Sequence, residues 1–230
     1  MDGIQKRQIL WTGVIGIAAA LIVCVGEYLL HYDALARYSE TSYEFLLAST
    51  DNQQTIGHFF GVLAAPLYLV GCWHMYLMLK PANQKLSFAM FVLTSYGFIM
   101  GAVWISSRAS IGAITHLEEG TLAIEGLVDL YQIRYETLLS IIRITTLVSS
   151  IIFVRLVLTG NTYYKKWQSI LNPILLLLIS FLIYLILPTI GKHMMPVALN
   201  IGFGVFFIMS TLQARTIKVD NKYRNSITGK

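Results

Sequence analysis

The hydrophobic positions of the chain gather into long runs that are separated by short polar segments. Each run has about 20 residues, the length that a helix needs to cross a hydrocarbon core about 30 Å thick. Because lipid offers the backbone no hydrogen bonds, each crossing segment is expected to be helical. Six runs meet this requirement, at residues 9–31, 56–79, 86–107, 136–157, 168–187 and 196–214.

The pattern therefore predicts an all-α integral membrane bundle of six transmembrane helices. It predicts one domain over residues 1–215 and a polar cytoplasmic tail at 216–230. The first run is longer than the roughly 7–15 apolar residues of a signal peptide, which predicts an uncleaved helix. Composition agrees with a membrane protein, since only 13% of the residues are charged, against about 25% in soluble domains.

The basic residues indicate the orientation of the bundle. If successive runs alternate in direction, most of them fall on one side of the membrane. They are Lys6, Arg7, Lys80, Lys85, Arg155, Lys165, Lys166, Arg215, Lys218, Lys222, Arg224 and Lys230. Such residues mark the cytoplasmic side, so we expect a multi-pass protein of the cell membrane with both termini cytoplasmic (N-in/C-in). This distribution of the net charge of +5 does not indicate a nucleic-acid partner.

The two long connections on the opposite side, 32–55 and 108–135, are expected to be outer loops, where binding groups are often mounted. Within the first, Thr41 and Glu44 have the spacing of a capping box, which predicts a short amphipathic helix. Cys24 and Cys72 lie inside apolar runs, so we expect packing residues and not a disulfide.

A stripe of polar residues follows the fourth run at steps of three or four residues. It contains Glu125, Asp129, Gln132, Glu136, Ser140, Arg143, Thr146 and Ser150. This spacing places them on one helix face. Arg143 lies about 10 Å deeper than Glu136 at 1.5 Å per residue, where an unpaired charge costs at least ~2.5 kcal/mol. We therefore expect Arg143 to face the bundle interior and to meet an acid.

The first run supplies a candidate acid. Glu27 and His31 lie one turn apart on one face, and we predict a Glu27–Arg143 ion pair. The other helices add polar groups in their outer halves, which together predict an outward-facing polar cavity. Its predicted lining residues are Glu27, His31, His58, Trp104, Arg108, Gln132, Glu136, Ser140 and Arg143. Small-xxx-small pairs, Gly57 with Gly61 and Gly97 with Gly101, favour close helix packing.

Three functions fit this pattern. Intramembrane charges commonly mark a ligand or ion path, so the leading hypothesis is the binding or passage of a small or lipid-like molecule. A second is a metal-dependent hydrolase of outer-leaflet lipid head groups, with zinc held by Glu27, His31 and His58, although no HExxH motif occurs. A third is a structural or partner-binding subunit, in which the ion pair only joins helices. The sequence does not decide between enzyme, transporter and structural protein, nor the oligomeric state.

Several motifs resemble those of a known family. They are the GHFFG segment at 57–61, the APLY segment at 65–68, Trp73 with His74, the GAVW segment at 101–104 and Ser107 with Arg108. This pattern is similar to a family of bacterial polytopic membrane proteins of about this length, without an established activity. The resemblance implies a bacterial cytoplasmic membrane, and it places His58, His74, Trp104 and Arg108 among the residues to test.

Overall fold

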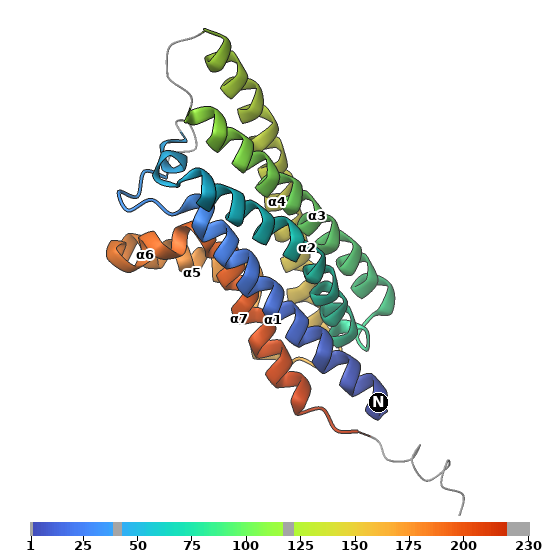
Figure 1. Ribbon diagram of the computed structural model, residues 1–230. Helices are drawn as coiled ribbons and strands as arrows, with labels where there is room; N and C mark the ends of the chain where they lie inside the picture. Colours follow the sequence, from blue (N-terminus) through green and yellow to red (C-terminus); the bar gives the residue numbers. More distant parts are fainter. Residues whose placement is uncertain (1, 39–42, 117–121, 220–230) are drawn as a thin grey trace, which may run out of the picture.

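A computed structural model describes residues 2–38, 43–116 and 122–219 of the chain, and these residues form an all-α bundle without a β-strand (Figure 1). Its elements in chain order are α1 (Gly3–His31), the 3-10 helix η1 (Glu44–Ala48), α2 (Asp51–Leu79), α3 (Gln84–Thr115), α4 (Leu122–Thr159), the 3-10 helix η2 (Lys166–Leu171), α5 (Pro173–Ile186), α6 (Pro188–Met194), the 3-10 helix η3 (Met195–Val197) and α7 (Ala198–Arg215).

Five helical segments of the described chain are long and apolar enough to cross a membrane. They are Gly3–His31, Asp51–Leu79, Gln84–Thr115, Asp129–Thr159 and Pro188–Arg215. Large apolar side chains such as Leu63, Ile144 and Leu185 are exposed on the outside of the bundle. A surface of this kind suits lipid and not water, so the fold is that of a membrane-embedded protein.

The fifth predicted run, 168–187, is divided in the structure. Its first part forms η2, and α5 begins only at Pro173, where the Asn172 side chain accepts a hydrogen bond from the Leu175 N–H at 3.1 Å. Proline suits the first position of a helix because it lacks the N–H that would be unpaired there. The 14 residues of α5 extend over about 21 Å at 1.5 Å per residue, less than the membrane core.

The predicted outer loop at 108–135 is largely helical, which corrects the sequence prediction. Helix α3 continues to Thr115, and α4 already begins at Leu122. The polar residues of this region recur at helical spacing, so the helix continues while one face becomes polar. Arg108 consequently lies inside a helix and not at its end.

The region of the predicted capping box is only partly described. Thr41 lies outside the described residues. The segment after it forms η1, and a capping box occurs instead at the start of α2, between Thr50 and Gln53. At the other end of the chain, α7 ends at Arg215, and the predicted tail at 216–230 is described only as far as Val219.

Both described chain ends lie at one end of the bundle (Figure 1). The Lys6 ammonium donates hydrogen bonds to the backbone oxygens of Arg215 and Ile217, at 2.9 and 2.6 Å. The connection before η2 reaches the same end, because the Tyr163 N–H donates to the Met78 carbonyl at 3.1 Å. The basic flanking residues of several helices therefore gather at this end.

Glycines allow α1 and α2 to pack with their backbones in contact. A Cβ atom on Gly26 would lie 2.8 Å from the Gly57 oxygen and 2.9 Å from the Gly61 nitrogen, and a Cβ on Gly57 would lie 2.7 Å from the Gly26 oxygen. The small-residue spacing in the sequence indicates this kind of contact. Gly101 differs, because a Cβ there would meet no atom within 4 Å.

A buried histidine joins the helices near the end that holds the termini. His74 Nδ1 lies 2.8 Å from the Ile9 carbonyl oxygen, so it must carry the proton and donate. Its Nε2 therefore accepts from the Ser210 hydroxyl at 2.6 Å, and the Tyr164 hydroxyl lies 2.7 Å from Ser210. These bonds connect α1, α2, α7 and the segment before η2, which gives His74 a structural role.

Candidate functional site

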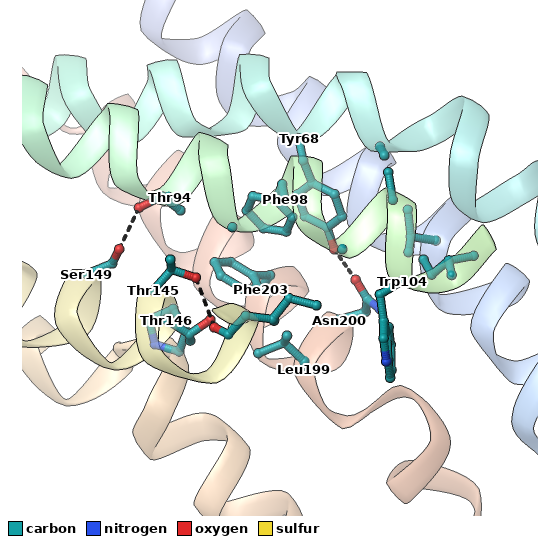
Figure 2. Close-up of a pocket in the computed structure, with 18 of the residues that line it drawn as sticks. Tyr68, Thr94, Phe98, Trp104, Thr145, Thr146, Ser149, Leu199, Asn200 and Phe203 are labelled. Atoms are coloured by element: carbon teal, nitrogen blue, oxygen red, sulfur yellow. Dashed lines mark hydrogen bonds between the residues drawn. The ribbon is translucent and has the colours of Figure 1, made fainter. Parts of the chain in front are cut away.

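A narrow cleft lies between α1, α2, α3, α4 and α7, with Pro173 of α5 at its edge. Its cavity volume is about 60 Å³. Figure 2 shows side chains from several helices pointing into this space. The cleft is therefore slender and well below the roughly 300–1,000 Å³ of a typical small-molecule pocket, so a ligand would have to part its side chains.

One end of the cleft is polar. The Tyr68 hydroxyl donates a hydrogen bond to the Asn200 side-chain oxygen (Figure 2), and the Asn200 amide donates to the Glu27 carboxylate. Tyr68, Asn200 and Glu27 come from α2, α7 and α1, and all three line the cleft. Each is buried, so this chain holds a carboxylate at a defined position inside an apolar bundle.

Arg108 of α3 completes this polar end. Its side chain is buried, and Nη1 lies 3.6 Å from a Glu27 oxygen. The guanidinium lies 3.8 Å above the ring of Trp104, and Nη2 contacts the His31 ring. Nε and Nη1 have no hydrogen-bond partner among the described residues. A buried arginine of this kind is stabilised by its acid and by the aromatic face.

The remainder of the cleft is mostly apolar. Tyr68 and Phe98 stack with ring centroids 3.9 Å apart, and Phe203 lies 4.7 Å from Phe98. Hydroxyl groups at the far end are already paired: Thr94 donates to the Met90 carbonyl at 2.8 Å and contacts Ser149 at 3.0 Å (Figure 2). The cleft therefore combines one charged end with a long apolar wall.

The predicted Glu27–Arg143 ion pair is replaced by a Glu27–Arg108 pair. Glu27 forms its ion pair with α3, whereas the Arg143 side chain is exposed on α4 and does not line the cleft. Gln132, Glu136 and Ser140 likewise lie outside the cleft lining, and only Thr146 of that stripe reaches it. The α4 face that lines the cleft holds Ile142, Thr145 and Ser149 instead.

The predicted metal ligands do not assemble. His58 lines a separate depression between α2 and α3, together with Asp51, Thr55 and Ser106. Over the part of the chain that is described, no group of three or more His, Cys, Asp or Glu side chains is placed to hold a metal ion. Glu27, His31 and His58 are thus not brought together as a ligand set.

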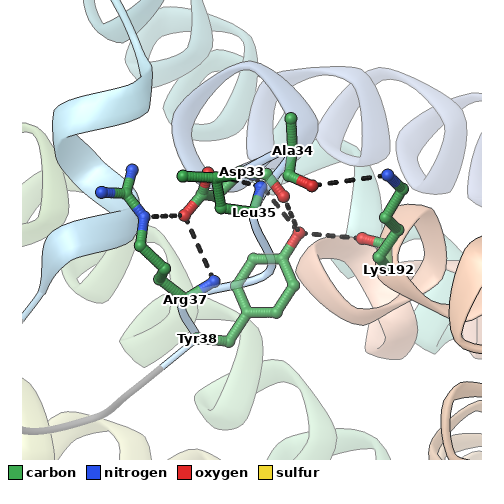
Figure 3. A network of polar contacts seen from close by, with 6 residues as sticks. All are labelled: Asp33, Ala34, Leu35, Arg37, Tyr38 and Lys192. Atoms are coloured by element: carbon green, nitrogen blue, oxygen red, sulfur yellow. Dashed lines mark hydrogen bonds and ion pairs between the residues drawn. The ribbon is translucent and has the colours of Figure 1, made fainter.

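A polar network fixes the segment that follows α1 (Figure 3). Asp33 accepts hydrogen bonds from the Leu35 N–H at 3.0 Å and from Arg37 Nε at 2.6 Å. Tyr38 donates to the Lys192 carbonyl at 2.8 Å, which ties this segment to α6. The turn includes Ala36 at a φ of 56°, a strained conformation for alanine.

The charges of this network follow from its contacts. Burial raises the pKa of the Asp33 carboxyl. Hydrogen bonds from Arg37 and from backbone N–H groups together lower this pKa by more than burial raises it, so it lies below its ordinary value. Burial is also the main cause that raises the pKa of Tyr38 to about 12. Asp33 is therefore ionised and Tyr38 neutral near neutral pH, as their hydrogen bonds require.

Comparison with known proteins places the whole helical region in one family. The pattern that defines DUF6796, a family of unknown function, matches residues 1–216. The chain belongs to the DUF6796 family. No curated protein and no solved structure matches it. Membership in the family assigns this DUF6796 protein no activity.

Tyr68 and Asn200 of this DUF6796 protein were not among the predicted lining residues, although Asn200 marks a polar face of its run. Tyr68 lies in the middle of an apolar run and Asn200 near the start of another. Their connection to Glu27, through Asn200, depends on how α1, α2 and α7 face one another. The available signal was Asn200 itself, because an amide inside an apolar membrane helix needs a partner.

Proposed function

We propose that this protein binds a lipid-like amphiphile in the cleft, with the polar group of the ligand at the Glu27 end and its apolar part along Phe98 and Phe203. The observation that carries the proposal is one slender space that joins a buried charged cluster to an apolar wall. Binding sites commonly combine a mostly apolar lining with a few convergent polar groups.

The arrangement of the helices around the cleft supports entry from the bilayer. Helix α4 packs chiefly along α3 and makes few contacts with α5 and α7. The cleft lies between these groups of helices, so a molecule dissolved in lipid would reach it sideways. A lipid-like ligand suits this route because it need not leave the hydrocarbon region.

The proposal includes six membrane crossings in a bacterial cytoplasmic membrane, with both termini on the cytoplasmic side. The hydrogen bonds of Lys6 to Arg215 and Ile217 hold the chain ends together, which requires an even number of crossings. Since α1, α2, α3, α4 and α7 are five long helices, α5 with its preceding η2 would be the sixth.

Labelling with a membrane-impermeant thiol reagent tests this topology. In a chain without Cys24 and Cys72, cysteines that replace the exposed residues Ala48 and Thr189 should react from outside. A cysteine that replaces Lys85, in the first turn of α3, should react only after the membrane is opened. The reverse pattern would invert the orientation, and reaction of all three from outside would contradict the six crossings.

Filling the cleft should remove the ligand without unfolding the protein. Gly101 lines the cleft, and a side chain there meets open space. Gly101→Leu is therefore expected to lower the amount of co-purifying lipid at least about tenfold, as native mass spectrometry would show, because the added atoms occupy the apolar wall.

Gly126→Leu is the matched control. Gly126 also lies in a helix, on α4, with open space around its Cβ, but it lies outside the cleft. Both variants gain helix propensity by about the same amount, up to ~1 kcal/mol. The proposal fails if wild-type protein retains no lipid, or if both variants retain as much as the wild type.

A further inference from the structure

The two charges at the polar end of the cleft balance each other. Glu27 and Arg108 form a close pair, and their side chains are only 9% and 1% exposed. Glu27 lines the cleft, whereas Arg108 is not part of the lining. An anionic head group would therefore meet the carboxylate first, at a site with no free positive charge to compensate it.

A cationic head group is also poorly suited to this end. Arg108 already supplies the counter-ion of Glu27, and its guanidinium already covers one face of Trp104. A ligand ammonium would have to compete with a buried guanidinium for both partners. Burying a further unpaired charge is costly, so the site favours a head group without charge.

Of the groups that line this end of the cleft, Glu27 and Trp104 have open hydrogen-bonding positions, and together they call for a group that both donates and accepts. Glu27 accepts one side-chain hydrogen bond, from Asn200, among the described residues, whereas a carboxylate has about four acceptor positions. Trp104 lines the same end, and its buried Nε1–H has no acceptor in the described part of the chain. A hydroxyl group is the small uncharged group that could donate to Glu27 and accept from Trp104.

The interior width limits the apolar part of the ligand. The cavity volume is only about 60 Å³, and its lining extends from Glu27 to Ser149. A single extended chain is the narrowest apolar group and would displace the packed side chains of Tyr68, Phe98 and Phe203 least, whereas a fused ring system or two parallel chains would displace them more.

We propose that the cleft selects an uncharged single-chain lipid with a hydroxyl head, of the class of long-chain alcohols and monoacylglycerols. This inference rests on the proposed function, since it names the ligand class of the same cleft. The head hydroxyl donates to Glu27 and accepts from Trp104, and the chain lies along Phe98 and Phe203.

A comparison of three probes of equal chain length tests the selectivity. Hexadecanol, hexadecanoate and hexadecylamine would be titrated against full-length protein in nanodiscs made of a phosphatidylcholine, with displacement of a fluorescent alkyl alcohol as the signal. The wild type is expected to bind the alcohol at least about tenfold more tightly than either charged probe, because each charged head adds an unpaired charge to a balanced site.

Glu27→Gln should change this preference in a way that a purely structural role would not. The variant leaves Arg108 without its acid, so hexadecanoate is expected to gain at least about tenfold relative to the alcohol. Trp104→Phe keeps an aromatic ring but removes the N–H together with part of the indole, so it should weaken alcohol binding relative to carboxylate binding. If Glu27→Gln does not fold, the comparison of the three probes on the wild type and on Trp104→Phe still tests the head-group preference.

The possible failures are distinguishable. If wild-type protein binds a charged probe as tightly as the alcohol, and Gly101→Leu abolishes that binding, the head-group inference is wrong and the proposed function stands. If no probe binds and Gly101→Leu retains as much co-purifying lipid as wild type, both are wrong. A Glu27→Gln variant that folds and keeps the wild-type preference would also overturn the inference.

Discussion

Replacing Arg108 by glutamine is expected to lower the free energy of unfolding by about 3–5 kcal/mol, because it leaves the buried Glu27 carboxylate without its counter-ion. The change also removes the guanidinium from the face of Trp104 and from the His31 ring. Unfolding in mixed detergent micelles, followed by circular dichroism, would measure the loss. This effect should be the largest from a single polar side chain of the described bundle, since Arg108 is its largest fully buried side chain.

The double variant Glu27→Gln with Arg108→Gln is the control for this prediction. It removes both charges at once, so it should recover most of the stability that Arg108→Gln loses, because two neutral amides avoid the cost of an unpaired charge. A double-mutant cycle would therefore give a coupling of about 0.5–3 kcal/mol or more. If the two losses simply add, the ion pair does not hold α1 and α3 together as the structure indicates.

The second large effect is expected at the contact of α1 with α2. Gly26→Ala should destabilise the bundle by at least about 1–3 kcal/mol. The new Cβ would lie 2.8 Å from the Gly57 oxygen and 2.9 Å from the Gly61 nitrogen. Both of these are backbone atoms, which cannot rotate away, so the two helices must separate. The same unfolding measurement applies.

Gly101→Ala is the matched control for Gly26→Ala. It makes the same chemical change inside a long helix, but its Cβ meets open space in the cleft. It should leave stability unchanged or raise it by about 0.5–1 kcal/mol, because alanine favours the helix more than glycine does. Equal losses in the two variants would show that helix propensity, and not the α1–α2 contact, governs the response.

The helices themselves were largely predictable. The runs predicted at 9–31 and 56–79 end where α1 and α2 end, at His31 and Leu79. Lipid requires a helix only where the backbone lies within it, so the helix can end where the apolar run ends. The prediction was wrong where one helix face turns polar, since α3 continues to Thr115. It was also wrong at 168–187, where the Asn172–Pro173 step starts a new helix.

The candidate site was predictable only in part. Glu27, His31, Trp104 and Arg108 were identified as polar groups in apolar surroundings, and the structure brings these four together. The partner of Glu27 was predicted wrongly, because Arg143 and Arg108 both lie at plausible depths in neighbouring helices. Periodicity places a residue on a face of its own helix, but it does not tell which neighbour that face meets.

The sequence by itself therefore determined the helical membrane character and the residues that are too polar for lipid. These properties depend on the local free energy of transfer between water and lipid, which is nearly the same in any packing arrangement. Only the tertiary structure decided that Arg108 meets Glu27, that Asn200 and Tyr68 join them, and that Gly101 borders open space. Those contacts depend on the rotation of each helix about its axis, which is set by the packing of residues distant in the chain.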